Sequence, residues 1–461
     1  MGTTRPEGTE VQDSAPPVQP AWRREGTLYV LGVDGLTLDV IEPMLAQGDL
    51  PNLARLVAEG CWGRLRTISP TVSPVIWTSI STGCHQRLHG IDGFHYYSMF
   101  GRRLSGATLR RARKVGLKAL LKGLKHVGLM PAHLFDARDV RRKRFWEILS
   151  DAGEGVGLVN WYHTWPAAPV NGFVISDRLV HWRVTARRRR ARPEGELTFP
   201  PELLEEADQL SLDPEHVPLE ELRRFANVPD TELQEFLRAA FARHDVRSEL
   251  RFIAAQDLSC WRLFDHCLSR FTDLTVAAAY LRGTDLAQHA AAQYVPWFRD
   301  VPVSDEERRR YGQTVLQAYR RADGFIGSVL TRMGPEDTLL VISDHGCGYQ
   351  KDRGNYGHTR GEPPGVLYAY GREFARGRQI ADASIYDVAP TLLRICGFPS
   401  AREMEGKCLE DILAPEFRRE HPPLEPIEGY GPPERRPCVS RKSRELDKEV
   451  MDHLRGLGYS D

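Results

Sequence analysis

Acidic and imidazole side chains follow two apolar runs of this sequence. Asp34 comes directly after the run 27–33 (TLYVLGV), and Asp344 and His345 follow the run 338–342 (TLLVI). Short apolar runs that end in polar residues are typical of buried strands, and open α/β sheets bind ligands at the carboxyl ends of their strands. An acid at such a place can also simply form a turn, so each position alone leaves both interpretations open.

A second group of residues could also bind a metal ion. Asp285 and His289 lie four positions apart in GTDLAQH, so a helix there would point both side chains the same way. His358 follows in the loop segment YGHTRGEPPG. Alone, a loop histidine is usually just solvated, and the spaced pair is a weak signal.

Taken together, the six residues favour a pair of metal ions. Carboxylate and imidazole ligands suit zinc and also manganese. Two such ions can hold both the attacking and the leaving oxygen of an in-line phosphoryl displacement, and one of them lowers the pKa of an attacking hydroxyl. We therefore expect two divalent metal ions, zinc or manganese, as cofactors.

A hydroxyl group that could attack lies in the segment 69–83, SPTVSPVIWTSISTG. Ser73 precedes Pro74, and a serine N-cap followed by proline is a standard helix start. That is the structural interpretation. The functional one is that a hydroxyl at a helix N-terminus lies among free N–H groups, where a phosphoryl group is stabilised. Thr71 is a second candidate for the same role.

Strand-like and helix-like segments alternate around these residues. Helices are expected, for example, at 53–59, 145–152 and 385–396, between strands at 27–33, 155–160, 274–281, 338–342 and 365–370. This alternation predicts an α/β fold with a mostly parallel sheet sandwiched by helices.

Two charged stretches interrupt the alternation. Residues 101–144 contain fourteen Lys or Arg and two acids, and residues 181–267 have a basic start and an acidic continuation. We expect both to be insertions that form a helical cap on a catalytic domain spanning 27–414. Residues 1–26 are expected to be a flexible tail, and residues 415–461 a proline-rich tail with a C-terminal helix at 443–457.

The composition limits the classes of function. The 461 residues include 62 Lys or Arg and 62 Asp or Glu, so the formal net charge is zero, which argues against general binding of nucleic acid. We find no secretion signal and no apolar run long enough to span a membrane. Eight scattered cysteines without a CxxC pair suit free thiols in a reducing compartment. We therefore expect a cytoplasmic location.

Three further features have more than one interpretation. Residues 108–127 have the spacing of a basic amphipathic helix, which could pack on the domain, make a peripheral contact with an anionic membrane or attract an anionic substrate. The aromatic segment 161–165 (WYHTW) could be core packing or could stack on a leaving group. Cys347, close to Asp344 and His345, is expected to be a bystander.

The order of the motifs is that of a known family. The segments LYVLGVDG, PTVSPVIWTSISTGCHQRLHGI, LRGTDLAQH, VISDHG, GHTRG and YDVAPTLLRICGFPSAREMEGK follow one another along the chain. The chain thereby resembles the alkaline phosphatase superfamily and is most similar to the type I phosphodiesterase/nucleotide pyrophosphatase family. The resemblance covers most of the chain outside the two insertions and implies an alkaline-phosphatase-like fold.

The resemblance also implies site residues. One metal ion would be held by Asp34, Asp344 and His345, and the other by Asp285, His289 and His358. Ser73, ten residues before Gly83, would bridge the ions and form a covalent phospho-enzyme.

The chain departs from the family pattern in two places. Many relatives have proline two residues after the nucleophile, whereas Pro74 directly follows Ser73, so Thr71 stays an alternative. Ile76 stands where nucleotide pyrophosphatases have an asparagine that contacts the phosphate, which leaves nucleotide specificity open.

The expected function is a two-metal phosphohydrolase that cleaves phosphodiester or phosphoanhydride bonds of a small-molecule phosphoester through a phosphoserine intermediate. A phosphomutase or phosphonate hydrolase of the same superfamily is one alternative. A non-catalytic membrane-surface binding protein is another.

Overall fold

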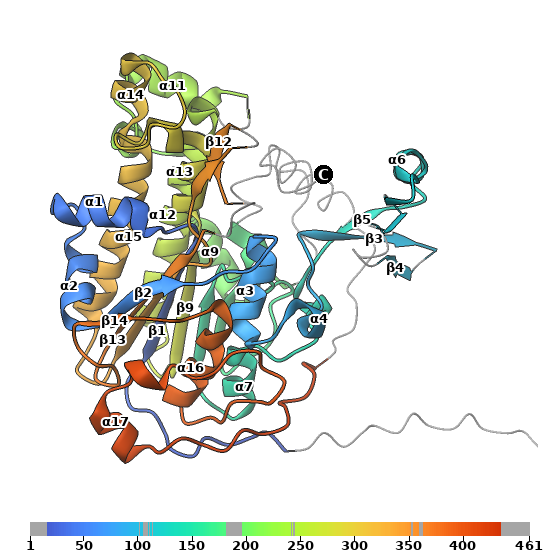
Figure 1. Ribbon diagram of the computed structural model, residues 1–461, viewed down its shortest axis with the longest axis vertical. Coiled ribbons are helices and arrows are strands. Elements are labelled where there is room, and N and C mark those ends of the chain that lie inside the picture. The colour runs from blue at the N-terminus through green and yellow to red at the C-terminus, as the bar shows by residue number, and fades with distance from the viewer. Residues whose placement is uncertain are drawn as a thin grey trace, which may run out of the picture.

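The computed structural model describes residues 16–434, except 101, 105–108, 110, 113, 181–195, 241, 243–244, 352–353 and 359–362. The helix expected at 443–457 and the basic start of the second insertion therefore lie outside the described residues. Figure 1 shows a central sheet with helices on both sides and a smaller sheet that projects from it.

The central sheet has nine strands in the order β14-β2-β13-β10-β1-β9-β6-β7-β8. Their bounds are β1 Leu28–Val33, β2 Cys61–Leu65, β6 Val156–Val159, β7 Gly172–Ile175, β8 Thr198–Phe199, β9 Val276–Leu281, β10 Thr338–Ile342, β13 Gly365–Tyr370 and β14 Arg378–Ile380. The five strands from β10 to β7 pair in parallel, and so do β2 and β14. The other pairs, at β13 and β8, are antiparallel. The predicted mostly parallel α/β sheet is confirmed.

Strand β1 shows why the sheet needs helices on both faces. Its side chains alternate, so Tyr29, Leu31 and Val33 enter one apolar core while Leu28 and Val30 enter the other. The first core is covered by helices α1 Leu38–Ala46, α2 Pro51–Glu59, α12 Val246–Arg270, α13 Gly283–Ala291 and α15 Gln313–Arg332. The second is covered by α3 Ser73–Thr82, α7 Phe145–Asp151 and α16 Val388–Ile395.

The first insertion forms the projecting sheet. Its strands are β3 His95–Met99, β4 Arg102–Leu104 and β5 Ala132–Leu134, with β3 in the middle, and α6 Lys118–His126 lies between β4 and β5. The expected continuous helix at 108–127 is wrong, because a turn interrupts it at 115–117, where Gly116 has a φ of +85°. Helix α7, which follows the stretch directly, covers the main sheet.

The second insertion is smaller than expected. Helices α9 Leu203–Leu210, α10 Leu219–Arg223 and α11 Asp230–Arg238 pack on the helix that follows them, and Leu203, Leu222 and Leu233 belong to the first apolar core. The following helix, α12, is buried along much of its length, and Leu250, Ile253 and Ala254 belong to the first apolar core. Helix α12 also contacts strands β6 and β9 of the central sheet, so the part of the predicted cap from 246 onward is a layer of the domain itself. Its charged residues made the sequence resemble a surface helix.

Both predicted tails contact the domain. Arg24 forms an ion pair with Glu373 in which both side chains are 2% exposed, so the domain begins before residue 27. At the other end, Tyr430 donates a hydrogen bond to the carbonyl of Pro399, beyond α17 Pro415–Glu420. Among the described residues, no helix combines the length and hydropathy needed to cross a membrane.

Candidate two-metal site

Three neighbouring parallel strands bring the candidate residues to one edge of the sheet. Strands β10, β1 and β9 lie side by side. Asp34 directly follows β1, Asp344 and His345 follow β10, and Asp285 lies in α13, which begins just after β9. The carboxyl ends of parallel strands meet at the same edge, so residues that are far apart in the sequence converge there.

The first cluster consists of Asp34, Asp344 and His345, all completely buried. His345 Nε2 lies 3.2 Å from Asp34 Oδ1 and 3.4 Å from Asp344 Oδ2. The Nδ1–H of the same ring can donate to the carbonyl of Gly346, 3.0 Å away. That contact leaves Nε2 as the nitrogen that offers a lone pair to the cluster.

The second cluster consists of Asp285, His289 and His358. Asp285 Oδ1 lies 3.4 Å from His289 Nε2 and 3.7 Å from His358 Nε2, and the two imidazole nitrogens are 3.1 Å apart. The spacing of Asp285 and His289 puts both on one side of α13, as their positions predict. His358 arrives from the end of β12 Asn355–Gly357, which pairs with β11 Gly348–Gln350.

The two clusters adjoin each other, and Ser73 lies beside them. The rings of His345 and His358 stack with their centroids 3.7 Å apart. Ser73 Oγ lies 3.4 Å from His345 Nε2, and Ser73 is 1% exposed. All seven candidate residues from the sequence are thus brought together in one buried place.

Helix α3 positions Ser73 through close packing on β1. Every residue of the helix is buried, and a Cβ atom added at Gly32 would lie 2.7 Å from the ring of Trp77. The glycine in β1 therefore lets the helix approach the strand that ends at Asp34. Ser73 is the first helical residue and Val72 the N-cap, so the expected serine N-cap is one position off.

Thr71 is less well placed as a nucleophile. Its side-chain hydroxyl donates a hydrogen bond to the carbonyl of Ile68 at 3.2 Å. The Ser73 hydroxyl instead faces a metal-ligand candidate, which favours Ser73 over Thr71.

Electrostatics in the site favour bound cations. Burial works against a charged His345 ring, but the carboxylates of Asp344 and Asp34 outweigh it and raise the pKa of His345 to about 10. Burial and the charge of Asp34 raise the pKa of Asp344 well above its usual range. Burial and the neighbouring His345 hold the pKa of His358 well below its usual value. The protein alone therefore leaves buried charges poorly compensated.

The donor set fits divalent ions. Asp34 Oδ1 and Asp344 Oδ2 are buried, and neither has a hydrogen-bond partner among the described residues. Both oxygens lie beside the Nε2 atom of His345, so three possible ligand atoms gather around one point. Buried carboxylate oxygens without donors are costly unless a cation compensates them.

Sequence reasoning missed two groups that support these ligands. The Tyr280 hydroxyl donates to Asp34 Oδ2, because β1 and β9 pair with Tyr280 opposite Gly32. Asp257 in α12 accepts hydrogen bonds from the backbone N–H groups of Arg282 and Gly283, at 3.1 and 3.0 Å, and so holds the start of α13. The only sequence signal for Tyr280 is a hydroxyl near the end of an apolar run.

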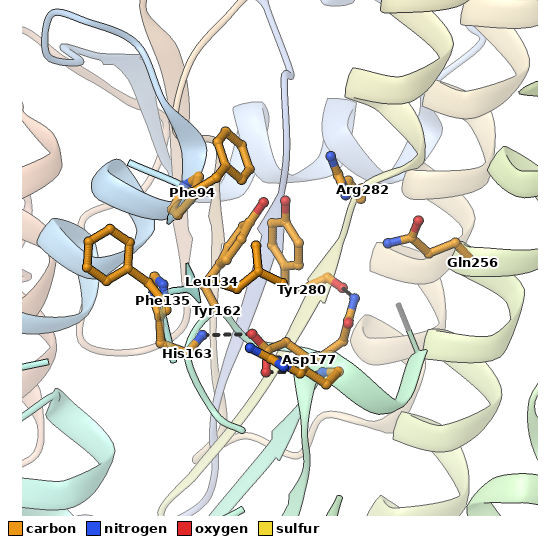
Figure 2. A pocket seen from close by; sticks show the side chains of 12 residues that line it. Phe94, Leu134, Phe135, Tyr162, His163, Asp177, Gln256, Tyr280 and Arg282 are labelled. Carbon is orange, nitrogen blue, oxygen red and sulfur yellow. Dashed lines mark hydrogen bonds between the residues drawn. The ribbon is translucent and has the colours of Figure 1, made fainter. Parts of the chain in front are cut away.

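A pocket opens next to Ser73. Its open space is about 610 Å³, including the part that reaches solvent, and Pro74 forms part of its wall. Figure 2 shows the rings of Tyr162 and Tyr280 side by side with their hydroxyl groups directed the same way, at a centroid distance of 5.0 Å. Arg282, which is 4% exposed, also lines it. The pocket thus offers aromatic surface and positive charge beside the candidate nucleophile.

The aromatic segment 161–165 divides between core and pocket. Trp161 is fully buried and packs edge-on against Trp77 with centroids 5.2 Å apart. Tyr162 and His163 line the pocket instead. Cys347 is buried, its thiol pKa is raised by burial, and it belongs to neither metal-ligand cluster.

Two curated 2,3-bisphosphoglycerate-independent phosphoglycerate mutases match locally. That of Agrobacterium fabrum is 34% identical over 106 residues, which is 22% of this chain and 20% of the mutase. That of Acaryochloris marina is 32% identical over 119 residues, which is 24% of this chain and 22% of the mutase. The chain therefore spans only about a fifth of the length of these relatives.

Two solved structures are also similar. A mutant of the alkaline phosphatase PafA has 12% identity and a TM-score of 0.49, with 85% of this chain and 99% of the other covered. Murine ectonucleotide pyrophosphatase/phosphodiesterase 5, as an inactive variant with AMP, has 12% identity and a TM-score of 0.44, with 85% and 100% covered.

The match to a family model is more extensive than either kind of similarity. The model of the type I phosphodiesterase/nucleotide pyrophosphatase family matches residues 28–356. That range begins with β1 and ends in β12, just before His358, so it contains both strands that lead to the first cluster. The chain belongs to the type I phosphodiesterase/nucleotide pyrophosphatase family, as its motifs had indicated.

Proposed function

We propose that this chain hydrolyses phosphodiester or phosphoanhydride bonds with two divalent metal ions and with Ser73 as the nucleophile. Membership of the family supports a hydrolase of the phosphodiesterase/pyrophosphatase type. The observation that carries the finer proposal is the gathering of two ligand clusters around stacked His345 and His358, with Ser73 Oγ 3.4 Å from His345 Nε2.

Each cluster would hold one ion. One set is Asp34, Asp344 and His345, and the other is Asp285, His289 and His358. Mixed carboxylate and imidazole ligands suit zinc, with manganese as the alternative. When bound, such ions neutralise phosphate charge and lower the pKa of a nearby hydroxyl.

Ser73 would supply the covalent step. Its Oγ forms a bond to phosphorus while the bond from phosphorus to the leaving oxygen breaks, and the hydroxyl proton ends on the leaving group. The product of this step is a phosphoserine that still carries the other substituent of the phosphate. Water then attacks the phosphoserine, which releases the phosphorylated product and restores the hydroxyl. The position of Ser73 at the start of α3 adds the positive end of the helix dipole, which favours the phosphoryl group.

The pocket beside Pro74 would receive the leaving group. Tyr162 and Tyr280 offer ring surface, and Arg282 offers a positive charge. These groups suit a small molecule with both an aromatic or apolar part and an anionic part.

Metal content and turnover of a Ser73→Ala variant test the proposal. The variant is expected to keep about two ions per chain and to lose hydrolysis of bis-p-nitrophenyl phosphate by at least about 1000-fold. A rapid acid quench of the wild type should trap a p-nitrophenyl phosphoryl group on Ser73. Thr71→Val is the matched control, and it should stay within a few-fold of wild type.

Two results would contradict the proposal. Full activity in Ser73→Ala with loss in Thr71→Val would move the nucleophile to Thr71. The proposed metal pair would be refuted if the purified protein held no divalent ions and a chelator did not lower its melting temperature. Ions that bind only the folded state must stabilise it.

A phosphomutase is a second candidate, since the chain is locally similar to two phosphoglycerate mutases. A mutase would convert 3-phosphoglycerate to its 2-phospho isomer without releasing phosphate, whereas the proposed hydrolase would not isomerise it. Phosphonate hydrolysis is a third candidate activity, and it is tested by offering the protein a phosphonate substrate in the same assays. A cytoplasmic location stays a prediction, and fractionation of the native cells would test it.

A further inference from the structure

The projecting segment, residues 95–134, concentrates the large exposed apolar side chains of the described part of the chain. Among the described residues, the large hydrophobic side chains that are exposed all lie between positions 100 and 129. They are Phe100, Val115, Leu117, Leu120, Val127 and Leu129. Single exposed hydrophobic residues are common on proteins, but a group of them confined to one projecting segment marks an interaction site.

The same segment carries a concentrated positive charge. Residues 101–130 contain nine Lys or Arg and no Asp or Glu, although the whole chain has a formal net charge of zero. Lys114, Lys118 and Lys122 are exposed. A partner for this surface must therefore accept both apolar side chains and many cations.

Helix α6 arranges the two kinds of residue side by side. Leu117, Leu120 and Leu124 recur every three or four positions, which places them on one face, and Lys118 and Lys122 fall on the neighbouring face. The helix is attached to the projecting sheet through Lys125, whose Nζ lies 3.8 Å from the centre of the Tyr97 ring. Leu120 is 56% exposed, so the sheet leaves part of the apolar face open.

The position of the segment leaves it accessible. Figure 1 shows β3, β4, β5 and α6 standing away from the layers of the main domain, with α6 at the outer end. The base of this sheet meets the catalytic domain at the pocket, because Leu134 in β5 and Phe94 just before β3 line it.

We propose that the projecting segment binds the surface of an anionic lipid bilayer. Phe100 and the apolar face of α6 enter the boundary between headgroups and acyl chains, and the lysines lie near the lipid phosphates. A bilayer needs no shape-complementary groove, and it matches both the apolar exposure and the absence of acids. The inference does not depend on the proposed hydrolysis.

Vesicle co-sedimentation of the full-length protein tests the inference. We expect binding to phosphatidylcholine vesicles with about 30% phosphatidylserine and little binding to pure phosphatidylcholine. The triple variant Lys114→Gln, Lys118→Gln and Lys122→Gln should bind the anionic vesicles on the order of 100-fold more weakly. Raising the salt to about 0.5 M should weaken the wild type in the same direction.

A charge-matched control separates local from overall charge. The triple variant Arg262→Gln, Arg376→Gln and Arg418→Gln removes three exposed cations from other parts of the surface and should bind like the wild type. If both triple variants lose the same affinity, a specific lipid-binding segment is refuted.

The apolar half is tested by Phe100→Ser combined with Leu120→Ser. This variant should melt like the wild type, since both side chains are exposed, and should bind anionic vesicles at least about 10-fold more weakly. Unchanged vesicle binding would overturn the proposed insertion. The surface would instead be assigned to a second copy of the chain by two results together. The wild type would fail to sediment with anionic vesicles, and it would form a dimer in sedimentation velocity that Phe100→Ser abolishes. The vesicle-binding measurements do not depend on hydrolysis, so the Ser73→Ala variant should bind anionic vesicles like the wild type even though it loses activity.

Discussion

His89 should make the stability of the nucleophile helix depend on pH. The side chain is completely buried, and its Nδ1 accepts a hydrogen bond from the backbone N–H of Ile91 at 3.2 Å. The proton of the neutral ring is therefore on Nε2, which donates to Ser79 Oγ in α3 at 3.1 Å. A second proton would be placed on Nδ1, directly against the Ile91 N–H.

The size of the effect follows from the pKa. Burial, with a small contribution from the charge of His85, lowers the pKa of His89 from 6.5 to about 3. Because the folded state binds the proton more weakly than the unfolded state, stability is fully present above about pH 6.5 and is lost as the pH falls. The loss is about 1.4 kcal/mol per pH unit, or about 2 kcal/mol at about pH 5.

Urea unfolding at about pH 7 and pH 5 measures this loss. His89→Gln should be less stable than the wild type at the higher pH. Between the higher and the lower pH, its free energy of unfolding should fall by about 2 kcal/mol less than that of the wild type. His216→Gln is the control, because the side chain of His216 is 74% exposed, and it should keep the wild-type pH dependence. Equal losses in His89→Gln and the wild type would refute the buried neutral imidazole.

Two other changes test how the metal ligands are held. Tyr280→Phe removes the hydroxyl that donates to Asp34, so metal affinity in a chelator competition should fall by about 10- to 100-fold, and an unchanged affinity would deny the tyrosine this role. Gly283→Ala places a Cβ atom 2.1 Å from Asp257 Oδ2, which should cost about 1–3 kcal/mol in urea unfolding and lower turnover. In the matched change Gly324→Ala the added Cβ has no atom within 4 Å apart from its chain neighbours and the backbone of its own helix. This change should raise stability by up to about 1 kcal/mol, and equal effects of the two changes would contradict the packing at Asp257.

The sequence was most informative where a buried strand ends in polar residues. The runs before Asp34 and Asp344 are almost wholly apolar, and their strands β1 and β10 are central in the sheet. A central parallel strand is buried on both faces, so its sequence is a continuous apolar run and is easily recognised. The position of Asp285 and His289 on one helix follows from local spacing in the same way.

Other features depend on contacts that no local pattern encodes. Tyr280 belongs to the run VAAAYL, where a tyrosine reads as core packing, and its bond to Asp34 exists only because β9 pairs with β1 in one register. Strand β13 was expected, but its antiparallel direction follows from how the chain returns after the loop that carries His358. The charges along α12 concealed its buried face, since three of its charged residues, Glu249, Arg251 and Asp257, are themselves buried.

The candidate site also connects the two apolar cores of the domain. Ser73 comes from α3, which packs on one face of the sheet, while Asp285 and His289 come from α13 on the other face. Asp34 and His345 lie at the sheet edge between them. Ions bound at both clusters would therefore tie the layers together across that edge. Their binding free energy would stabilise the whole domain rather than one loop. Removing them should accordingly lower the cooperative melting temperature instead of producing a separate early transition.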